Sequence, residues 1–134
     1  MINEFLFVYG TLRRQAGNSR HDLLAQHCRF YGPATLRGRL YEINGYPGAI
    51  ESDNPGHRVA GELYRIIKRK PLFALLDDYE ECSDRYPLPQ EYARKRIRVE
   101  TVGGKALQAW VYLYNYPVQG LTEIRHGDYL RYRP

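Results

Sequence analysis

Short apolar stretches separated by turn residues run through most of this chain. An apolar and aromatic run at 4–9 ends at Gly10 and predicts a buried strand followed by a turn. The pattern at 21–27 predicts about two helical turns, whereas 28–43 has glycine and proline breaks that are typical of extended pieces that bend. The first third of the chain is therefore expected to be mostly extended, with one short helix.

The clearest helical pattern begins at Lys70-Pro71, because the fixed backbone of proline suits the first helical position. Apolar residues then follow at the helical spacing i, i+3, i+4 and i+7, at Leu72, Leu75, Leu76 and Tyr79. An Asn44-Gly45 turn and an alternating strand at 59–67 precede this helix.

Alternating strands predicted at 92–101 and 106–114 flank Gly103-Gly104, which can adopt the positive φ angles of a tight hairpin turn. The second strand is apolar or aromatic on both faces, so we expect it in the middle of a sheet. Several strands, one main helix and short flanking helical segments predict an α+β fold. We expect its mixed β-sheet to be strongly curled and barrel-like.

Length and composition favour one domain over residues 1–134, because this size is the commonest for single domains. No apolar run approaches the ~20 residues that span a bilayer. The first residues also lack a basic region, and their apolar stretch is too brief for a secretory signal. We therefore expect a cytoplasmic protein without a membrane anchor.

Cysteine and histidine usage supports neither a disulfide scaffold nor a metal centre. Cys28 and Cys82 are the only cysteines and form no C-x-x-C pair, so each is interpreted as a small core residue. The histidines lack the spacing of zinc ligands, and they are His21, His27, His57 and His126. The sequence thus disfavours metal catalysis.

Basic residues outnumber acidic ones by 20 to 15, most of them are arginines, and tyrosine is abundant with 13 copies. Such residues could bind single-stranded nucleic acid by charge and stacking, or they could line a polar pocket for a small charged ligand. Arg94, Arg96 and Arg98 alternate on one predicted strand, but an exposed strand face needs no ligand. No recognition motif accompanies them, so we expect no nucleic-acid partner.

The first candidate binding site is the strand end Tyr9-Gly10-Thr11-Leu12. A glycine at the end of a buried strand lets successive backbone N–H groups point toward one spot, and such nests bind anionic oxygens. An ordinary strand-to-loop turn explains the same residues. Neither glycine pattern of the common nucleotide-binding loops is present.

The second candidate is an acidic cluster at the end of the main helix, formed by Asp77, Asp78, Glu80 and Glu81. Glu80 differs from the others because it lies seven residues after Phe73 and four after Leu76, and so borders the apolar face. Burial and the helix dipole both raise the pKa of a carboxyl group there, which suits a general acid or base. Asp77 shares part of that side and is a second possibility.

Tyrosines on the predicted strands are further candidates. Tyr92 and Tyr112 could each contact a ligand, or each could be a buried tyrosine with a hydrogen-bonded hydroxyl group. The segment Tyr46-Pro47-Gly48 could line a pocket or simply form a turn.

Several segments, in this order, resemble motifs of the gamma-glutamylcyclotransferase family (AIG2-like). They are Phe7-Val8-Tyr9-Gly10-Thr11-Leu12-Arg13, Tyr46-Pro47-Gly48-Ala49-Ile50, Gly61-Glu62-Leu63-Tyr64, Leu75-Leu76-Asp77-Asp78-Tyr79-Glu80, Tyr92-x-Arg94 and Ala109-Trp110-Val111-Tyr112. The resemblance covers nearly the whole chain, and it looks closest to the gamma-glutamylamine cyclotransferase-like branch.

This resemblance implies a small barrel-like fold with one cavity and no metal or organic cofactor. Family enzymes cyclise the γ-glutamyl group of a small-molecule substrate to 5-oxoproline and release a free amine. By resemblance, the essential glutamate corresponds to Glu80, as general acid and base. The expected substrate-binding residues are Tyr9, Gly10, Thr11, Leu12, Tyr92 and Tyr112.

Two departures from the family pattern lie near the inferred pocket. Glu81-Cys82 follow Glu80 where many members have glycine, and the loop 83–91 looks longer than usual. We expect this loop to specialise the side that receives the leaving group. A noncatalytic small-molecule binding protein that uses the same pocket is the alternative, since a fold does not by itself establish turnover.

Overall fold

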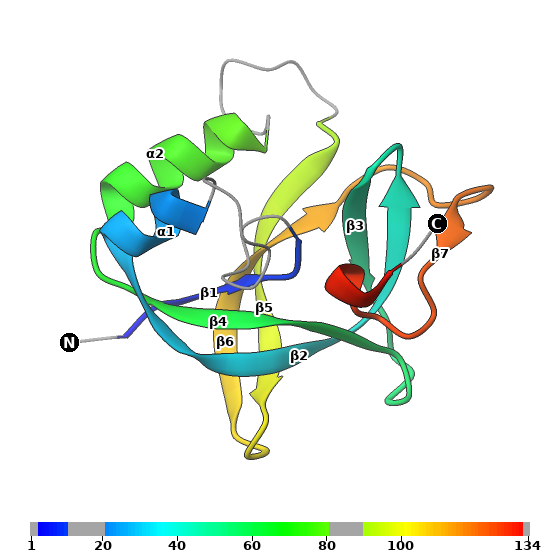
Figure 1. Cartoon of the computed structure of the whole chain (residues 1–134), viewed down its shortest axis with the longest axis horizontal. Helices are drawn as coiled ribbons and strands as arrows, with labels where there is room; N and C mark the ends of the chain where they lie inside the picture. Colours follow the sequence, from blue (N-terminus) through cyan, green and yellow to red (C-terminus); the bar gives the residue numbers. More distant parts are fainter. Residues whose placement is uncertain (1–2, 11–20, 81–89, 133–134) are drawn as a thin grey trace.

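Five strands form a closed, mixed barrel in the computed structural model, which describes residues 3–10, 21–80 and 90–132. Around the barrel the order is β2 (Cys28–Ile43), β4 (Arg58–Ile66), β1 (Phe5–Val8), β6 (Ala106–Tyr114) and β5 (Tyr92–Thr101), and β5 pairs back onto β2 (Figure 1). Strands β1 and β6 are parallel, whereas the other neighbours are antiparallel. The expected α+β fold with a curled, barrel-like sheet is confirmed.

Strand β2 is continuous where the sequence predicted separate extended pieces. The expected bend is a β-bulge between Phe30 and Gly32 within one strand of 16 residues. Its second half leaves the barrel and pairs with β3 (Tyr46–Glu51) and β7 (Thr122–Glu123), next to a short 3₁₀ helix, η2 (Tyr129–Arg131). The turn between β2 and β3 is at Asn44-Gly45 as predicted, with positive φ angles of 52° and 96°.

The two helices, α1 (His21–His27) and α2 (Arg69–Tyr79), pack together on one side of the barrel (Figure 1). Helix α2 begins at Arg69, so Pro71 occupies the first turn and not the predicted first position. The first-turn N–H groups of a helix have no intrahelical partner, so a proline is tolerated there. No helix in the described parts of the chain is long and apolar enough to cross a membrane.

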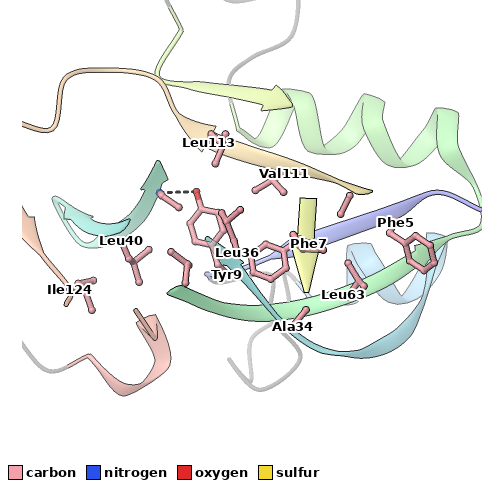
Figure 2. Close-up of a cluster of buried hydrophobic side chains, with 14 residues drawn as sticks. Phe5, Phe7, Tyr9, Ala34, Leu36, Leu40, Leu63, Val111, Leu113 and Ile124 are labelled. Carbon is pink, nitrogen blue, oxygen red and sulfur yellow. Dashed lines mark hydrogen bonds between the residues drawn. The ribbon is translucent and has the colours of Figure 1, made fainter. Parts of the chain in front are cut away.

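Apolar side chains form two layers that share strand β1. Phe5, Phe7 and Tyr9 belong to the cluster inside the barrel (Figure 2), whereas Leu6 and Val8 pack with the helices. Because successive side chains of a strand point to opposite faces, β1 is buried on both sides and contributes to both layers. The helix layer is completed by buried residues that include Leu24, Cys28, Leu72, Phe73 and Leu76.

Candidate active site

The strand end at Tyr9 holds three strands together inside the barrel. The Tyr9 hydroxyl accepts a hydrogen bond from the backbone N–H of Ala49 at 3.2 Å (Figure 2). It donates one to the backbone carbonyl of Tyr112 at 2.6 Å. Burial raises the pKa of Tyr9, and the nearby charge of Glu80 raises it further. The hydroxyl therefore remains neutral and keeps the proton that it donates to β6.

Gly10 follows at the point where this strand end approaches β3. A Cβ atom at Gly10 would lie 2.7 Å from the Cγ atom of Pro47, which is closer than real Cβ contacts come. The same Pro47 offers its carbonyl oxygen to the Tyr92 hydroxyl at 2.6 Å. The segment that begins with Tyr46-Pro47 therefore lies at the candidate site and connects Gly10 with Tyr92.

Glu80 lies directly after the last residue of α2, and its backbone N–H donates to the Leu76 carbonyl at 2.8 Å. Its side chain is half-buried. Burial, and secondly the negative charge of Glu91, raise the pKa of Glu80 from 4.5 to about 7. No lysine or arginine among the described residues forms an ion pair with this carboxylate.

Asp77, which the sequence left as a second possibility, has partners for both carboxylate oxygens. The Tyr112 hydroxyl donates to Oδ1 at 2.6 Å, and Nη2 of Arg94 lies 3.5 Å from Oδ2. The Arg94 guanidinium also lies over the Phe73 ring, with Cζ 3.9 Å from the ring centroid. Asp77 thus attaches the end of α2 to β5 and β6, which leaves Glu80 as the better candidate for acid–base chemistry.

The predicted site residues are therefore brought together in part. Tyr9, Tyr92 and Glu80 lie close enough for the charge of Glu80 to raise the pKa of both tyrosines, and Gly10 adjoins them through Pro47. Tyr112 contributes its backbone carbonyl to this group, whereas its hydroxyl binds Asp77 in the helix layer. The predicted residues Thr11 and Leu12, like most of the loop at 83–91, lie outside the described residues.

Sequence reasoning did not single out Glu91, which immediately precedes β5. The Tyr46 hydroxyl donates to Oε2 of Glu91 at 2.8 Å, and the charge of Glu91 reaches Glu80 and Tyr92. The sequence signal that could have indicated Glu91 is its position directly before Tyr92, the first residue of β5 and a predicted site residue. A neighbour in sequence of a site residue also lies near the site.

Two other observations concern sites of a different kind. Among the residues that the structure describes, no three His, Cys, Asp or Glu side chains are grouped to hold a metal ion. A shallow cleft of about 150 Å³ lies between β2, β4 and β5, and its lining includes Arg37, Arg58, Arg98 and Glu100. None of the residues around Glu80 lines this cleft.

Cys28 is buried, in agreement with its interpretation as a core residue.

The fold and this group of residues can be compared with known proteins. The sequence profile of the family described as gamma-glutamyl cyclotransferase, AIG2-like, matches residues 6–131. The chain therefore belongs to this family, as the resemblance in its motifs implied.

The alignments with related proteins extend over nearly the full length of this chain. The gamma-glutamylcyclotransferase family protein YtfP of Escherichia coli K12 is 36% identical over 126 residues, which are 93% of this chain and 95% of that protein. The gamma-glutamylaminecyclotransferase of Bos taurus is 32% identical over 149 residues, covering 96% of this chain and 81% of that protein. The crystal structure of an AIG2-like protein from Mus musculus has a TM-score of 0.64 and 26% identity, and the match covers 100% of this chain and 97% of that one.

Proposed function

We propose that this protein cyclises the γ-glutamyl group of an amine or peptide to 5-oxoproline and releases the free amine, with Glu80 as general acid and base. The observation that carries this proposal is the half-buried Glu80 carboxyl group, whose pKa of about 7 lies near neutral pH. The similarity to a protein named gamma-glutamylaminecyclotransferase supports an amine as the released group.

The reaction needs one group that first accepts and then returns a proton. The substrate's α-ammonium group transfers a proton to the Glu80 carboxylate, and its nitrogen attacks the γ-carbonyl carbon to close the ring. As the tetrahedral intermediate collapses, the Glu80 carboxyl group protonates the departing nitrogen and the C–N bond to the leaving amine breaks. The Glu80 carboxylate regenerated in this way takes the second proton from the ring nitrogen and passes it to the released amine, which leaves as an ammonium ion. A carboxyl group with a pKa near 7 is suited to both steps, since either protonation state is readily reached.

The strand end at Tyr9-Gly10 is proposed to bind the substrate's anionic groups. Its backbone N–H groups can hold the α-carboxylate or stabilise the oxyanion that forms when the γ-carbonyl carbon becomes tetrahedral. Closure of a five-membered ring is intramolecular, so a site that holds the bent conformer removes much of the entropic barrier. The hydrogen bonds of the Tyr9 and Tyr92 hydroxyls to backbone carbonyls keep this region in place.

The direct test incubates purified protein with γ-glutamyl-lysine, γ-glutamyl-alanine and glutathione, and measures 5-oxoproline. A Glu80→Gln variant is assayed in parallel, and its circular dichroism and unfolding transition establish that it is folded. We expect product from the wild type and none from the folded variant, because the amide cannot accept the α-ammonium proton.

Two outcomes would contradict the proposal. Unchanged activity of Glu80→Gln would remove Glu80 from the mechanism. Saturable binding of 5-oxoproline to the wild type, without amine release from any compound of the panel, would instead indicate a binding protein that uses the same pocket.

A further inference from the structure

The proposed reaction requires one carboxylate, but a second carboxylate, that of Glu91, lies beside it. Glu91 is half-buried, and its charge is close enough to Glu80 to raise the pKa of that group. Its Oε2 atom accepts the Tyr46 hydroxyl at 2.8 Å, and its backbone carbonyl accepts the backbone N–H of Asn115 at 2.7 Å. Within the described parts of the chain no lysine or arginine forms an ion pair with Glu91.

Tyr46, which contacts this second carboxylate, is the first of four tyrosines whose rings follow one another in a row. The ring centroids of Tyr46 and Tyr92 are 6.3 Å apart, those of Tyr92 and Tyr114 are 5.6 Å apart, and those of Tyr114 and Tyr116 are 5.9 Å apart. Tyr92 within the row is buried, whereas Tyr46 and Tyr116 at its two ends are exposed, so the row connects the site with solvent at both ends. The charge of Glu91 raises the pKa of Tyr114 as well as Tyr92, which places Glu91 along this row.

A carboxylate next to tyrosine rings is a chemical environment that binds an organic cation. The electron-rich faces of aromatic rings attract ammonium groups, and a nearby carboxylate supplies the opposite charge. An anion would meet two carboxylates here, Glu80 and Glu91, and would be repelled. A neutral alkyl chain could contact the rings but would leave the Glu91 carboxylate without a counter-charge.

The row also offers a position for the leaving group. In the proposed reaction the γ-glutamyl part reaches Glu80 and the strand end at Gly10, so the remainder of the substrate is expected to extend toward solvent. The contact between the exposed Tyr46 hydroxyl and the Glu91 carboxylate is close to Glu80 and open to solvent, so it is the position that we assign to the leaving group.

We propose that Glu91, with the rings of Tyr46, Tyr114 and Tyr116, recognises a positive charge on the leaving amine. This inference rests on the proposed cyclotransferase function and specifies its substrate class. The preferred substrates are γ-glutamyl amides of diamines, whose released half carries a second ammonium group and no carboxylate. Glu91 is then a specificity-determining residue, and Glu80 remains the acid–base group.

The test compares two substrates that differ only at the far end of the leaving group. One is the γ-glutamyl amide of 1,4-diaminobutane, which ends in an ammonium group, and the other is that of 1-aminopentane, which ends in a methyl group. We expect the wild type to prefer the diamine compound by about tenfold in kcat/KM. The preference should shrink as salt increases, because salt screens the attraction between the ammonium group and Glu91.

Glu91→Gln is the decisive variant, since the amide oxygen can still accept the Tyr46 hydroxyl and the fold is retained. We expect it to lower the preference to less than about threefold, by slowing the diamine compound and not the alkyl one. Glu51→Gln removes the same charge at the exposed far end of β3 and should keep the wild-type preference. Equal rates for the two substrates in the wild type, or an unchanged preference in Glu91→Gln, would overturn the inference.

Calorimetric titration of both compounds into Glu80→Gln separates this inference from the proposed function. Tighter binding of the diamine compound, lost in the Glu80→Gln/Glu91→Gln double variant, would support charge recognition by Glu91 even if the wild type turned over neither compound. Binding of this kind without turnover would contradict the proposed cyclotransferase function but support the proposed cation site. Equal binding of both compounds would overturn the cation site whatever the turnover.

Discussion

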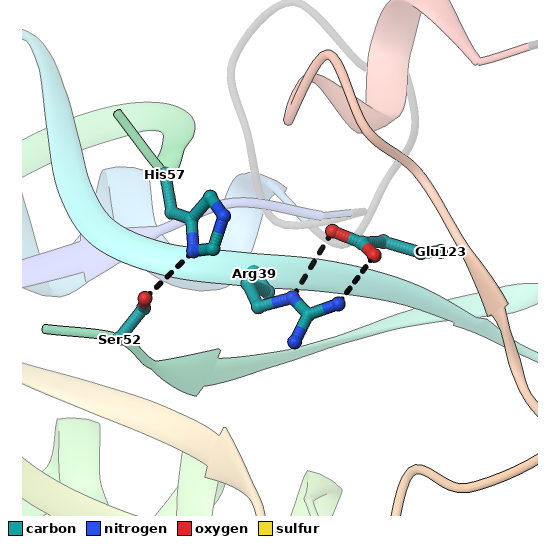
Figure 3. Close-up of polar contacts among 4 residues, drawn as sticks. All are labelled: Arg39, Ser52, His57 and Glu123. Atoms are coloured by element: carbon teal, nitrogen blue, oxygen red, sulfur yellow. Dashed lines mark hydrogen bonds and ion pairs between the residues drawn. The ribbon is translucent and has the colours of Figure 1, made fainter. Parts of the chain in front are cut away.

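Glu80 and Glu123 are both half-buried carboxylates, one after the end of α2 and the other on β7, and their surroundings differ in kind. Arg39 holds Glu123 by two hydrogen bonds, Nη2 to Oε1 at 2.7 Å and Nε to Oε2 at 3.2 Å (Figure 3). This bidentate contact lowers the pKa of Glu123, and the charges of Arg125 and His57 contribute. Glu80 is partly buried and lies near a second carboxylate, that of Glu91, and these two effects raise its pKa to about 7.

Partial burial alone therefore does not make a carboxylate a good proton acceptor near neutral pH. A carboxylate that is fully paired with a guanidinium is a poor proton acceptor, because accepting the proton breaks the ion pair. Asp77 lies between these extremes, with the Tyr112 hydroxyl on one oxygen and Arg94 near the other. The absence of a cationic partner therefore distinguishes Glu80 from the other two among the described residues.

The largest effect should come from moving the Glu80 carboxylate, the proposed acid–base group, while keeping its charge. Glu80→Asp withdraws the group by one methylene and should lower kcat about 100-fold, because general acid–base catalysis depends on reach. Glu123→Asp makes the same change in the paired carboxylate and should leave kcat within about twofold of the wild type. Steady-state assays of 5-oxoproline formation measure both. Similar losses in the two variants would contradict the contrast between these residues.

The next effect tests whether Asp77 positions Glu80. Asp77→Asn weakens the link from α2 to Arg94 and should lower kcat about tenfold with little change in KM, because Glu80 follows one turn later on the same helix end. Arg94→Met should act in the same direction. Arg69→Met removes the exposed contact with Glu4, at 3.0 Å, from the other end of α2 and serves as the control. Equal effects of Arg69→Met and Arg94→Met on kcat would indicate general loosening of the helix.

A smaller effect concerns stability as a function of pH. The pKa of Glu80 is raised to about 7 in the folded state, so the unfolded chain loses this proton first as pH rises from 4.5. Ionisation of Glu80 therefore destabilises the fold progressively between pH 4.5 and about 7. Glu80→Gln should raise Tm by roughly 5 °C at pH 8 and leave it nearly unchanged at pH 4. Thermal unfolding at the two pH values measures this, and an equal change at both would exclude Glu80 as its source.

The smallest effect is expected at Glu123. Its pKa is lowered by Arg39, so its contribution to stability is present above pH 4.5 and is lost as pH falls below that value. The Arg39 side chain is 40% exposed, so solvent screens the pair. Glu123→Gln should therefore reduce the free energy of unfolding at pH 7 by less than about 1 kcal/mol. Denaturant unfolding provides the measurement, and a loss above about 2 kcal/mol would contradict the expected screening.

Local signals in the sequence predicted most of the secondary structure. The hairpin at Gly103-Gly104 and the turn at Asn44-Gly45 depend on backbone preferences of neighbouring residues, and both are in the structure. The continuity of β2 was not predictable in this way, because it depends on pairing with four other strands, β3, β4, β5 and β7. Gly38 shows the reason, since a Cβ atom there would overlap the backbone carbonyl of Ile50 on β3.

The candidate site, too, was predictable from the sequence only where local signals determine it. Helix periodicity alone distinguished Glu80 from its acidic neighbours, and in the structure Glu80 is half-buried with a raised pKa. The difference between Glu80 and Asp77 was not predictable, because it depends on Tyr112 and Arg94 from two other strands. Glu91 was missed because its effect arises only once the barrel has brought it next to Glu80.

The position of β1 determines when this barrel can form during synthesis. Leu6 lies between Tyr64 of β4 and Trp110 of β6, so the strand nearest the N-terminus has one neighbour that is made more than 100 residues later. Contacts of such high sequence separation are slow to form. The apolar segment Phe5–Val8 can pair with β4 first, but its other edge remains open until β6 has been made. Tyr9 is attached to this strand, so the site is among the last parts of the molecule to be assembled.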